Sequence, residues 1–288
     1  MVVRMNPVRA AALLAADPVT FARKSLARLS GMLGVPSGRR MLRIGDVRFE
    51  CDLALDPRVR DMYFGAYEPE EVAFLRRTLR AGDVCVDVGA NIGYFTAIAA
   101  ACVGPNGAVH AFEPVPEYYA RLAALRVANP GHRIHTVNDA LGSSEGTAQI
   151  RVTRDRNIGW NTLVPGFMAP DAARATHSVR VRRLDEYLAA AGVERVALVK
   201  LDAEGYELLV LEGLRTVLAG NARPVILCEV APHAYPLLGR TVDELFTFMA
   251  AFGYRAARVD GHPIGSGEIH ATSNIVFRPD TPDRLAGR

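Results

Sequence analysis

Short apolar runs alternate with segments of helical periodicity along the chain from residue 82 onward. The runs with the length and composition of buried strands cover residues 84–88, 108–112, 134–137, 196–201 and 225–230. Strands that alternate with helices are typical of a parallel sheet with crossover helices on its faces. We therefore expect an α/β fold, which two further strands, at 254–259 and 274–277, complete.

A different, helical pattern occupies the first 45 residues. Apolar side chains recur on one face between Phe21 and Leu33, while basic residues lie elsewhere. We predict an N-terminal helical extension over residues 1–45 that packs on one large domain over residues 46–288. A basic amphipathic helix also suits a membrane surface, so peripheral membrane contact of this extension stays open as an alternative.

Composition and charge narrow the setting of the protein. A formal net charge of +3 is small for 288 residues, and the basic residues form no run that could follow a phosphate backbone, so nucleic acid is not an expected partner. The four cysteines lack the paired spacing of disulfides or zinc sites. No apolar stretch reaches the roughly 18 residues of a membrane-spanning helix. We expect a cytoplasmic protein, and the sequence leaves its oligomeric state open.

A turn with two glycines follows the first strand of the alternating pattern. It contains Asp87, Gly89, Asn91 and Gly93 in the sequence Asp-Val-Gly-Ala-Asn-Ile-Gly. Glycines between a buried strand and a helix let a ligand approach the backbone, and the helix N-terminus offers unpaired amides to ligand oxygens. One glycine of the dinucleotide fingerprint Gly-x-Gly-x-x-Gly is missing, which favours a nucleoside without a pyrophosphate. We predict that these four residues bind such a cofactor.

Further polar residues end the second and third strands. Glu113 lies about 20 residues beyond Gly93, where a carboxylate can accept hydrogen bonds from both ribose hydroxyls. Asn138 and Asp139 follow the third strand, where a side-chain oxygen can accept from an adenine amino group, although such residues are also ordinary turn formers. Together with the missing glycine, Glu113 narrows the expected cofactor to S-adenosylmethionine. An NAD-dependent oxidoreductase shares the strand, the glycine turn and the distant acid, and it stays the alternative.

Five segments add a more specific pattern. They are residues 67–71 (Tyr-Glu-Pro-Glu-Glu), 87–96, 111–114 (Ala-Phe-Glu-Pro), 138–142 and 199–207 (Val-Lys-Leu-Asp-Ala-Glu-Gly-Tyr-Glu). Together they resemble the FkbM-type methyltransferases. The resemblance implies a Rossmann-like class I methyltransferase fold, with a seven-stranded, mostly parallel sheet, helices on both faces and an antiparallel last strand. It also implies S-adenosylmethionine as methyl donor and, usually, a hydroxyl acceptor on a sugar, a glycolipid or a secondary metabolite.

The candidate catalytic residues stand at the ends of the fourth and fifth strands. Methyl transfer to a hydroxyl requires alignment of donor and acceptor and is helped by a base, and the carboxyl ends of the strands face the ligand crevice. We expect Asp202 to contact the reacting hydroxyl, Lys200 to orient groups or stabilise charge, and Glu204 to point at the crevice. Glu229 and His233 are further candidates, because a histidine can take a hydroxyl proton near neutral pH.

No metal ion is expected. Asp202 with Glu229 would supply only part of an oxygen-ligand set for a divalent cation, and the histidines lack metal-ligand spacing. The loop between the strands expected at 147–153 and 178–182 is a candidate lid, whose Trp160 is suited to stack on the acceptor. A non-catalytic module that only binds a nucleoside stays the second alternative. The sequence does not identify the acceptor.

Overall fold

The computed structural model describes residues 17–34, 36–153 and 161–280. The first elements are α2 (Pro18–Leu33), β1 (Arg39–Ile44), β2 (Val47–Asp52) and α3 (Pro57–Tyr63), which together we call the N-terminal unit. Asp17 caps α2, because its carboxylate accepts a hydrogen bond from the amide of Thr20 at 2.9 Å. Gly34 ends the helix with a φ of 65°, a conformation that favours glycine.

The N-terminal unit is only partly helical. β1 and β2 form an antiparallel hairpin, so the boundary expected near residue 45 falls in the turn between two paired strands. Alternate residues of β2, namely Val47, Phe49 and Cys51, are buried and belong to the core that contains α5 and α6. The short β1 carries three arginines and is mostly exposed, which hid its strand periodicity in the sequence.

A seven-stranded sheet forms the centre of the fold. Its strands are β3 (Val84–Val88), β4 (Ala108–Phe112), β5 (Arg133–Val137), β10 (Leu198–Leu201), β11 (Val225–Val230), β12 (Tyr254–Arg258) and β13 (Ser273–Pro279). Their order across the sheet is β12-β13-β11-β10-β3-β4-β5. β13 runs antiparallel to both of its neighbours, and the other six strands run in one direction. This confirms the expected Rossmann-like sheet with an antiparallel last strand.

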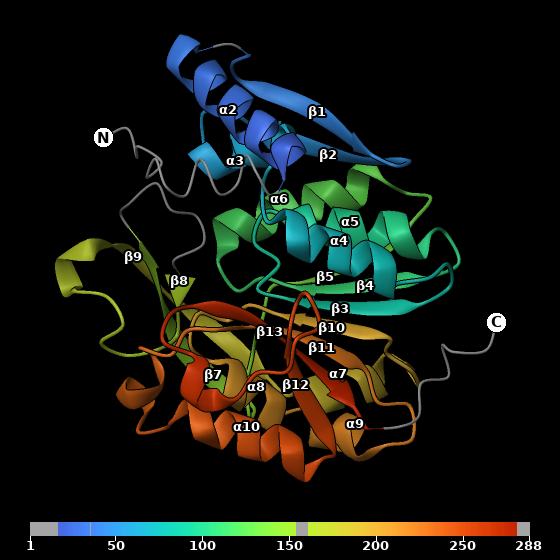
Figure 1. Cartoon of the computed structure of the whole chain (residues 1–288), viewed down its shortest axis with the longest axis vertical. Coiled ribbons are helices and arrows are strands. Elements are labelled where there is room, and N and C mark those ends of the chain that lie inside the picture. The colour runs from blue at the N-terminus through green and yellow to red at the C-terminus, as the bar shows by residue number, and fades with distance from the viewer. Residues whose placement is uncertain (1–16, 35, 154–160, 281–288) are drawn as a thin grey trace.

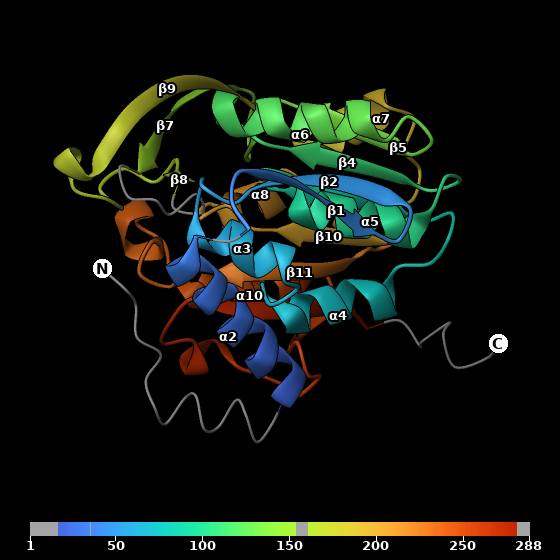
Figure 2. The same cartoon turned by 90° about the horizontal axis from the view of Figure 1, so that it is seen from above.

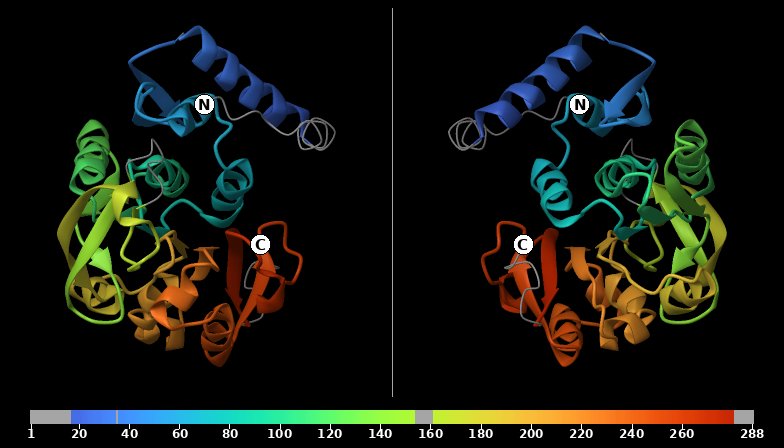
Figure 3. Two further views of the ribbon diagram at one scale, coloured as in Figure 1. Left: turned by 90° about the vertical axis from the view of Figure 1, so that its left-hand side faces the viewer. Right: turned by 90° about the vertical axis from the view of Figure 1, so that its right-hand side faces the viewer.

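Helices cover both faces of this sheet (Figure 1). One face carries α4 (Pro69–Thr78), α5 (Tyr94–Val103) and α6 (Pro116–Ala128), and the other carries α7 (Leu184–Ala190), α8 (Glu207–Glu212), α9 (Arg215–Ala219) and α10 (Val242–Ala251). Strand side chains alternate between the two layers: Leu198 packs in the first core, whereas Val199 and Leu201 pack in the second. The N-terminal unit forms an outer layer over α4 and α5 (Figure 3). Among the described helices, none is both long and apolar enough to cross a membrane.

A second sheet is inserted between β5 and β10. Its strands are β6 (Ala140–Leu141), β7 (Gly146–Thr153), β8 (Asn161–Thr162) and β9 (Ala173–Arg182), in the order β6-β9-β7-β8. β7 and β9 pair with each other in antiparallel fashion and extend together to one side of the molecule (Figure 2). Short 3-10 helices lie at Pro170–Ala172, Tyr235–Leu238 and Ser266–Glu268.

The helical segment between β10 and β11 is divided into α8 and α9. Gly213 lies between them, and a Cβ at this position would lie 2.1 Å from the carbonyl oxygen of Gly142. Gly142 follows β6, so the division marks the point where the second sheet meets the helical layer. This contact joins segments that are far apart in the sequence, and local periodicity gives no sign of it.

Candidate active site

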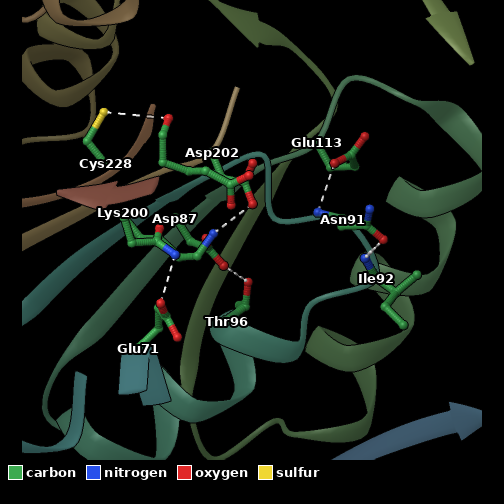
Figure 4. Close-up of polar contacts among 11 residues, drawn as sticks. Glu71, Asp87, Asn91, Ile92, Thr96, Glu113, Lys200, Asp202 and Cys228 are labelled. Atoms are coloured by element: carbon green, nitrogen blue, oxygen red, sulfur yellow. Dashed lines mark hydrogen bonds and ion pairs between the residues drawn. The ribbon is translucent and has the colours of Figure 1, made fainter. Parts of the chain in front are cut away.

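A row of polar side chains crosses the central sheet at the carboxyl ends of its parallel strands, the edge at which the antiparallel β13 begins. Asp87 of β3 lies opposite Lys200 of β10, and Glu229 of β11 lies opposite Asn274 of β13. Leu198, two positions before Lys200, packs in the core beneath α4 and α5. Because side chains alternate along a strand, the polar row faces the same helices. Figure 4 shows Lys200 between Asp87 and Asp202 in this row.

Lys200 carries a positive charge although its side chain is only 6% exposed. Its ammonium nitrogen lies 3.2 Å from Oδ2 of Asp202 and 4.6 Å from the centre of the Phe95 ring. Burial acts to lower the pKa of Lys200, but the surrounding carboxylates outweigh burial and raise that pKa above its usual value. The carboxylates with the largest effect are those of Asp202 and Asp87. A charged ammonium can orient or stabilise negative groups, but it cannot accept a proton.

Three carboxyl groups converge where β10 and β11 leave the sheet. Oxygens of Asp202, Glu204 and Glu229 all lie within 4.8 Å of one another. Burial, followed by the charge of Asp202, raises the pKa of Glu204 well above its usual range, and the charge of Asp202, followed by burial, does the same for the pKa of Glu229. Glu204 thus adds a third group to the pair considered from the sequence. Such a cluster can hold protons or a cation.

Side chains at the N-terminus of α4 lie over this row. The sequence patterns gave these side chains no role. Tyr67 lines the cleft, and Glu71 accepts a hydrogen bond from the side-chain amide of Asn274 at 2.8 Å. Burial raises the pKa of Glu68 to about 7. The sequence offered two signals here: residues 67–71 belong to the pattern that resembles the FkbM-type methyltransferases, and Pro69 favours the first position of a helix.

Three residues of the site hold a left-handed backbone conformation. Glu68, Asn91 and Glu204 have φ angles of 41°, 53° and 48°, and among the described residues they are the only ones other than glycine with positive φ. Each such conformation costs on the order of 1–3 kcal/mol and persists only where the surroundings enforce it. Asn91 and Glu204 line the cleft, and Glu68 follows its lining residue Tyr67. The concentration of strain in one place marks the cleft as functional.

The glycines of the turn after β3 are required by packing within the chain. A Cβ at Gly89 would lie 1.8 Å from the carbonyl oxygen of Asp202, and a Cβ at Gly93 would lie 2.9 Å from the side chain of Leu125. The amide of Gly89 also donates a hydrogen bond to the carbonyl of Phe112 at 3.0 Å. The turn is therefore pressed between the end of β10 and helix α6. Of the two glycines, Gly89 lines the cleft and Gly93 stands behind it.

Asp87 is fully buried at the base of the cleft. Its Oδ2 accepts a hydrogen bond from the hydroxyl of Thr96 at 2.6 Å, whereas its Oδ1 has no partner among the described residues. Burial raises the pKa of Asp87, although the charge of Lys200 acts against this. An unsatisfied buried acceptor is costly, so this oxygen is suited to a hydrogen-bond donor of a ligand.

Glu113 is buried in the wall of the cleft at the end of β4. One of its carboxyl oxygens accepts from the amide of Asn91 and the other from the amide of Val115, both at 2.8 Å. Burial raises the pKa of Glu113 to about 8, although these two hydrogen bonds act to lower it. Each oxygen retains a second acceptor site, so the group can still receive a ligand hydroxyl.

The other sequence candidates take different positions. The side-chain amide of Asn138 donates a hydrogen bond to the backbone carbonyl of Glu113 at 2.8 Å. This side chain therefore holds the backbone of Glu113 in place. Asp139 lines the cleft and lies 3.6 Å from the guanidinium of Arg182. His233 is exposed and packs on Phe167 with ring centres 4.9 Å apart.

Together these elements enclose one cleft with about 940 Å³ of empty space, its open mouth included. It has the concave shape and the mixed apolar and polar lining of small-molecule sites. The sequence-predicted residues that line it are Asp87, Gly89, Asn91, Glu113, Asp139, Lys200, Asp202 and Glu204. Gly93, Asn138, Glu229 and His233 are not part of this lining. Asn161 and Leu163 reach the cleft from the candidate lid, whereas Trp160 lies outside the described residues.

Several known proteins are similar to this chain. A family described as the methyltransferase FkbM domain matches residues 87–256. The 31-O-demethyl-FK506 methyltransferase FkbM of Streptomyces tacrolimicus is 30% identical over 214 residues, which cover 64% of this chain and 73% of that protein. The hexuronic acid methyltransferase AglP of Haloferax volcanii is 30% identical over 170 residues, which cover 56% of this chain and 61% of that protein.

Among solved structures, the methyltransferase FkbM from Methylobacillus flagellatus KT matches 93% of this chain and 60% of its own, with a TM-score of 0.44 and 14% identity. The family match at residues 87–256 covers more than half of the 288 residues. It includes the glycine turn, Glu113 and the segment from Lys200 to Glu207. The resemblance seen in the sequence is confirmed: this chain belongs to the FkbM methyltransferase family.

Proposed function

We propose that the cleft binds S-adenosylmethionine and that the protein transfers its methyl group to a hydroxyl oxygen of a small-molecule or glycan acceptor. The observation that carries this proposal is the placement of Asp87, Glu113 and Asp202, whose carboxyl groups reach one cleft from three adjacent strands. The cleft offers several hydrogen-bond acceptors, and its turn lacks the Gly-x-Gly-x-x-Gly pattern. Both features suit a cofactor that presents amino and hydroxyl donors rather than a pyrophosphate.

The hydrogen-bond acceptors of the cleft match the donors of S-adenosylmethionine. The unpartnered Oδ1 of Asp87 would receive the amino group of the methionine part. Glu113 would receive the ribose hydroxyls, and Asp139 the adenine amino group. Gly89 and Asn91 would border the nucleoside. Gly93 and Asn138 would act indirectly, because the first lets α6 approach the turn and the second holds the backbone of Glu113.

When bound, S-adenosylmethionine supplies a methyl group on a positively charged sulfur. Asp202 opens on the cleft and is held by its ion pair with Lys200, so it would accept the proton of the acceptor hydroxyl as the oxygen attacks. Glu204, kept neutral by its raised pKa, would donate a hydrogen bond to the acceptor. Lys200 would hold Asp202 in position and stabilise negative charge. Glu229 would support this cluster from β11.

We propose sugar, glycolipid or secondary-metabolite hydroxyls as acceptors. The names of the two relatives refer to an oxygen of FK506 and to a hexuronic acid, which are acceptors of these classes. We further propose a cytoplasmic protein without a nucleic acid partner, since the net charge is only +3. An N-terminal extension over residues 1–45 before a methyltransferase domain over residues 46–288 remains our proposal for the domain organisation.

The proposal is tested with methyl-labelled S-adenosylmethionine and a panel of monosaccharides, uronic acids, glycolipids and macrolide alcohols. We expect label in a product that survives mild alkali, because methyl ethers are stable there and methyl esters are hydrolysed. Label released by alkali, or found on an amine, would contradict O-methylation of a hydroxyl. Binding of NAD without S-adenosylhomocysteine would favour an oxidoreductase. Binding of S-adenosylhomocysteine without transfer to any acceptor would favour a non-catalytic relative.

A further inference from the structure

A second cavity, which we call the arginine cavity, separates the N-terminal unit from the methyltransferase domain. It holds about 1260 Å³ of empty space, its open mouth included, and is lined by α2, β1, α3, α4 and α5. Four arginines line it, namely Arg23, Arg43, Arg76 and Arg77, and no aspartate or glutamate of the described residues does. Figure 2 shows α2 beside α3, and both helices supply part of the cavity wall. The cavity therefore concentrates positive charge in a chain whose net charge is small.

The charges of these arginines are not neutralised within the described part of the chain. Arg23 donates to the carbonyl of Gly65 and Arg77 to the carbonyl of Val259, but neither forms an ion pair with a described residue. Arg43 on β1 and Arg76 on α4 make neither a side-chain hydrogen bond nor an ion pair to the described residues. Two guanidinium groups, one from β1 and one from α4, are thus available to a ligand.

The arginine cavity adjoins the cofactor cleft. Met62 and Tyr94 line both spaces. Burial raises the pKa of Tyr94 to about 12, although the charges of Arg76 and Arg23 act to lower it. The guanidinium groups of Arg76 and Arg23 therefore lie within electrostatic reach of the Tyr94 side chain, which lies between the two spaces. The arginine cavity and the cofactor cleft therefore share a wall, which the buried side chains of Met62 and Tyr94 form.

We propose that the arginine cavity binds an anionic group, phosphate or carboxylate, of the acceptor, remote from the hydroxyl that is methylated. Guanidinium groups bind both anions through paired hydrogen bonds. Tyr63, Phe64 and Leu42 in the same wall would contact the uncharged part of the acceptor. Binding at a remote site helps to align the reacting group. This proposal rests on the proposed function and names the acceptor class as anionic.

The test measures binding of two probes, inorganic pyrophosphate and D-glucuronate, to the full chain by calorimetry at low salt. The variant combines Arg43→Gln with Arg76→Gln, which removes charge without breaking a described hydrogen bond. The matched control combines Arg126→Gln with Arg195→Gln, two exposed arginines outside the cavity without an ion pair to a described residue. Both double variants lose the same net charge. We expect one anion per wild-type chain, at least tenfold weaker binding in the cavity variant, and a change under twofold in the control.

The probes also distinguish the source of the anion. Binding of pyrophosphate alone identifies a phosphate-bearing acceptor, binding of glucuronate alone a carboxylate-bearing one, and binding of both supports the shared chemistry. Absence of saturable binding of either probe, or equal weakening in the two double variants, would overturn the proposal. Affinity for S-adenosylhomocysteine is measured in parallel and should not change in either variant. If the wild-type protein does not bind S-adenosylhomocysteine, the result counts against the proposed function. If it binds S-adenosylhomocysteine but neither anion, the result counts only against the proposal for the arginine cavity.

Discussion

The ammonium nitrogen of Lys200 lies 3.2 Å from Oδ2 of Asp202, and the two residues differ sharply in exposure: the side chain of Lys200 is 6% exposed and that of Asp202 is 25% exposed. The buried Lys200 fixes the position of the more exposed Asp202. The carboxylate of Asp202 thus stays oriented and remains accessible to an acceptor in the cleft. This relationship follows from strand alternation, which places positions 200 and 202 on the same side of β10 and its continuation.

Lys200→Met should destabilise the fold, because it removes the cation that faces Asp87 and Asp202 from the centre of the polar row. Removal of one partner from a buried ion pair costs about 3–5 kcal/mol. Urea denaturation would measure the free energy of unfolding. Lys24→Met removes the only other lysine of the chain and serves as control, with an expected change of about 0.5 kcal/mol or less. Equal losses for the two variants would show that the buried ion pair does not support the fold.

Glu68→Gln should flatten the dependence of stability on pH. Burial raises the pKa of Glu68 to about 7 in the folded protein, from an ordinary value of 4.5. Between these values the folded state holds a proton that the unfolded state has lost, so the unfolding free energy of the wild type falls as pH rises from 4.5 to 7. A shift of this size corresponds to about 3 kcal/mol.

The amide introduced by Glu68→Gln does not titrate, so the difference in unfolding free energy between wild type and variant should itself change across this pH range. Glu70→Gln is the matched control, because Glu70 lies in the first turn of α4, two positions after Glu68, and is exposed. A Glu68→Gln difference that stays constant from pH 4.5 to 7 would contradict the assigned titration.

Gly89→Ala should be far more damaging than Gly82→Ala. Both glycines have positive φ, 72° and 88°, so both substitutions carry the backbone strain of about 1 kcal/mol or more. Only at position 89 would the added Cβ meet another atom, the carbonyl oxygen of Asp202 at 1.8 Å, whereas nothing lies within 4 Å at position 82. Thermal unfolding of the two variants measures the difference. Similar melting temperatures would contradict this prediction, because they would show that the backbone at the end of β10 can move to admit the added Cβ.

Chelation by EDTA should leave methyl transfer unchanged. Lys200 already supplies a cation beside Asp202, and the raised pKa values of Glu204 and Glu229 keep these two groups protonated near neutral pH. We therefore expect the carboxyl cluster to hold protons rather than a metal ion. Activity that disappears on chelation and returns with Mg²⁺ would assign the cluster to a cation instead.

Local patterns predicted the central sheet and much of the cleft. Asp87, Glu113 and Lys200 each lie at the end of an apolar strand, and the ends of parallel strands meet at one edge. The contribution of α4 was not predictable in this way. Glu71 meets Asn274 across 203 positions, and periodicity within a helix does not show which strand ends it will cover. The reason for Gly89 was also non-local, because its neighbour is the backbone of Asp202. Glu68 was missed because its charge state depends on burial beneath other elements.

The most direct test of the account compares wild type with Asp202→Asn in two assays on the same preparation. One is titration with S-adenosylhomocysteine, and the other is methyl transfer to whichever hydroxyl acceptor the panel identifies. We predict that both proteins bind S-adenosylhomocysteine with similar affinity and that the variant loses about 10²–10⁴-fold in transfer rate, the typical contribution of a positioned base. Failure of the wild type to bind S-adenosylhomocysteine, or unchanged transfer in Asp202→Asn, would contradict the account.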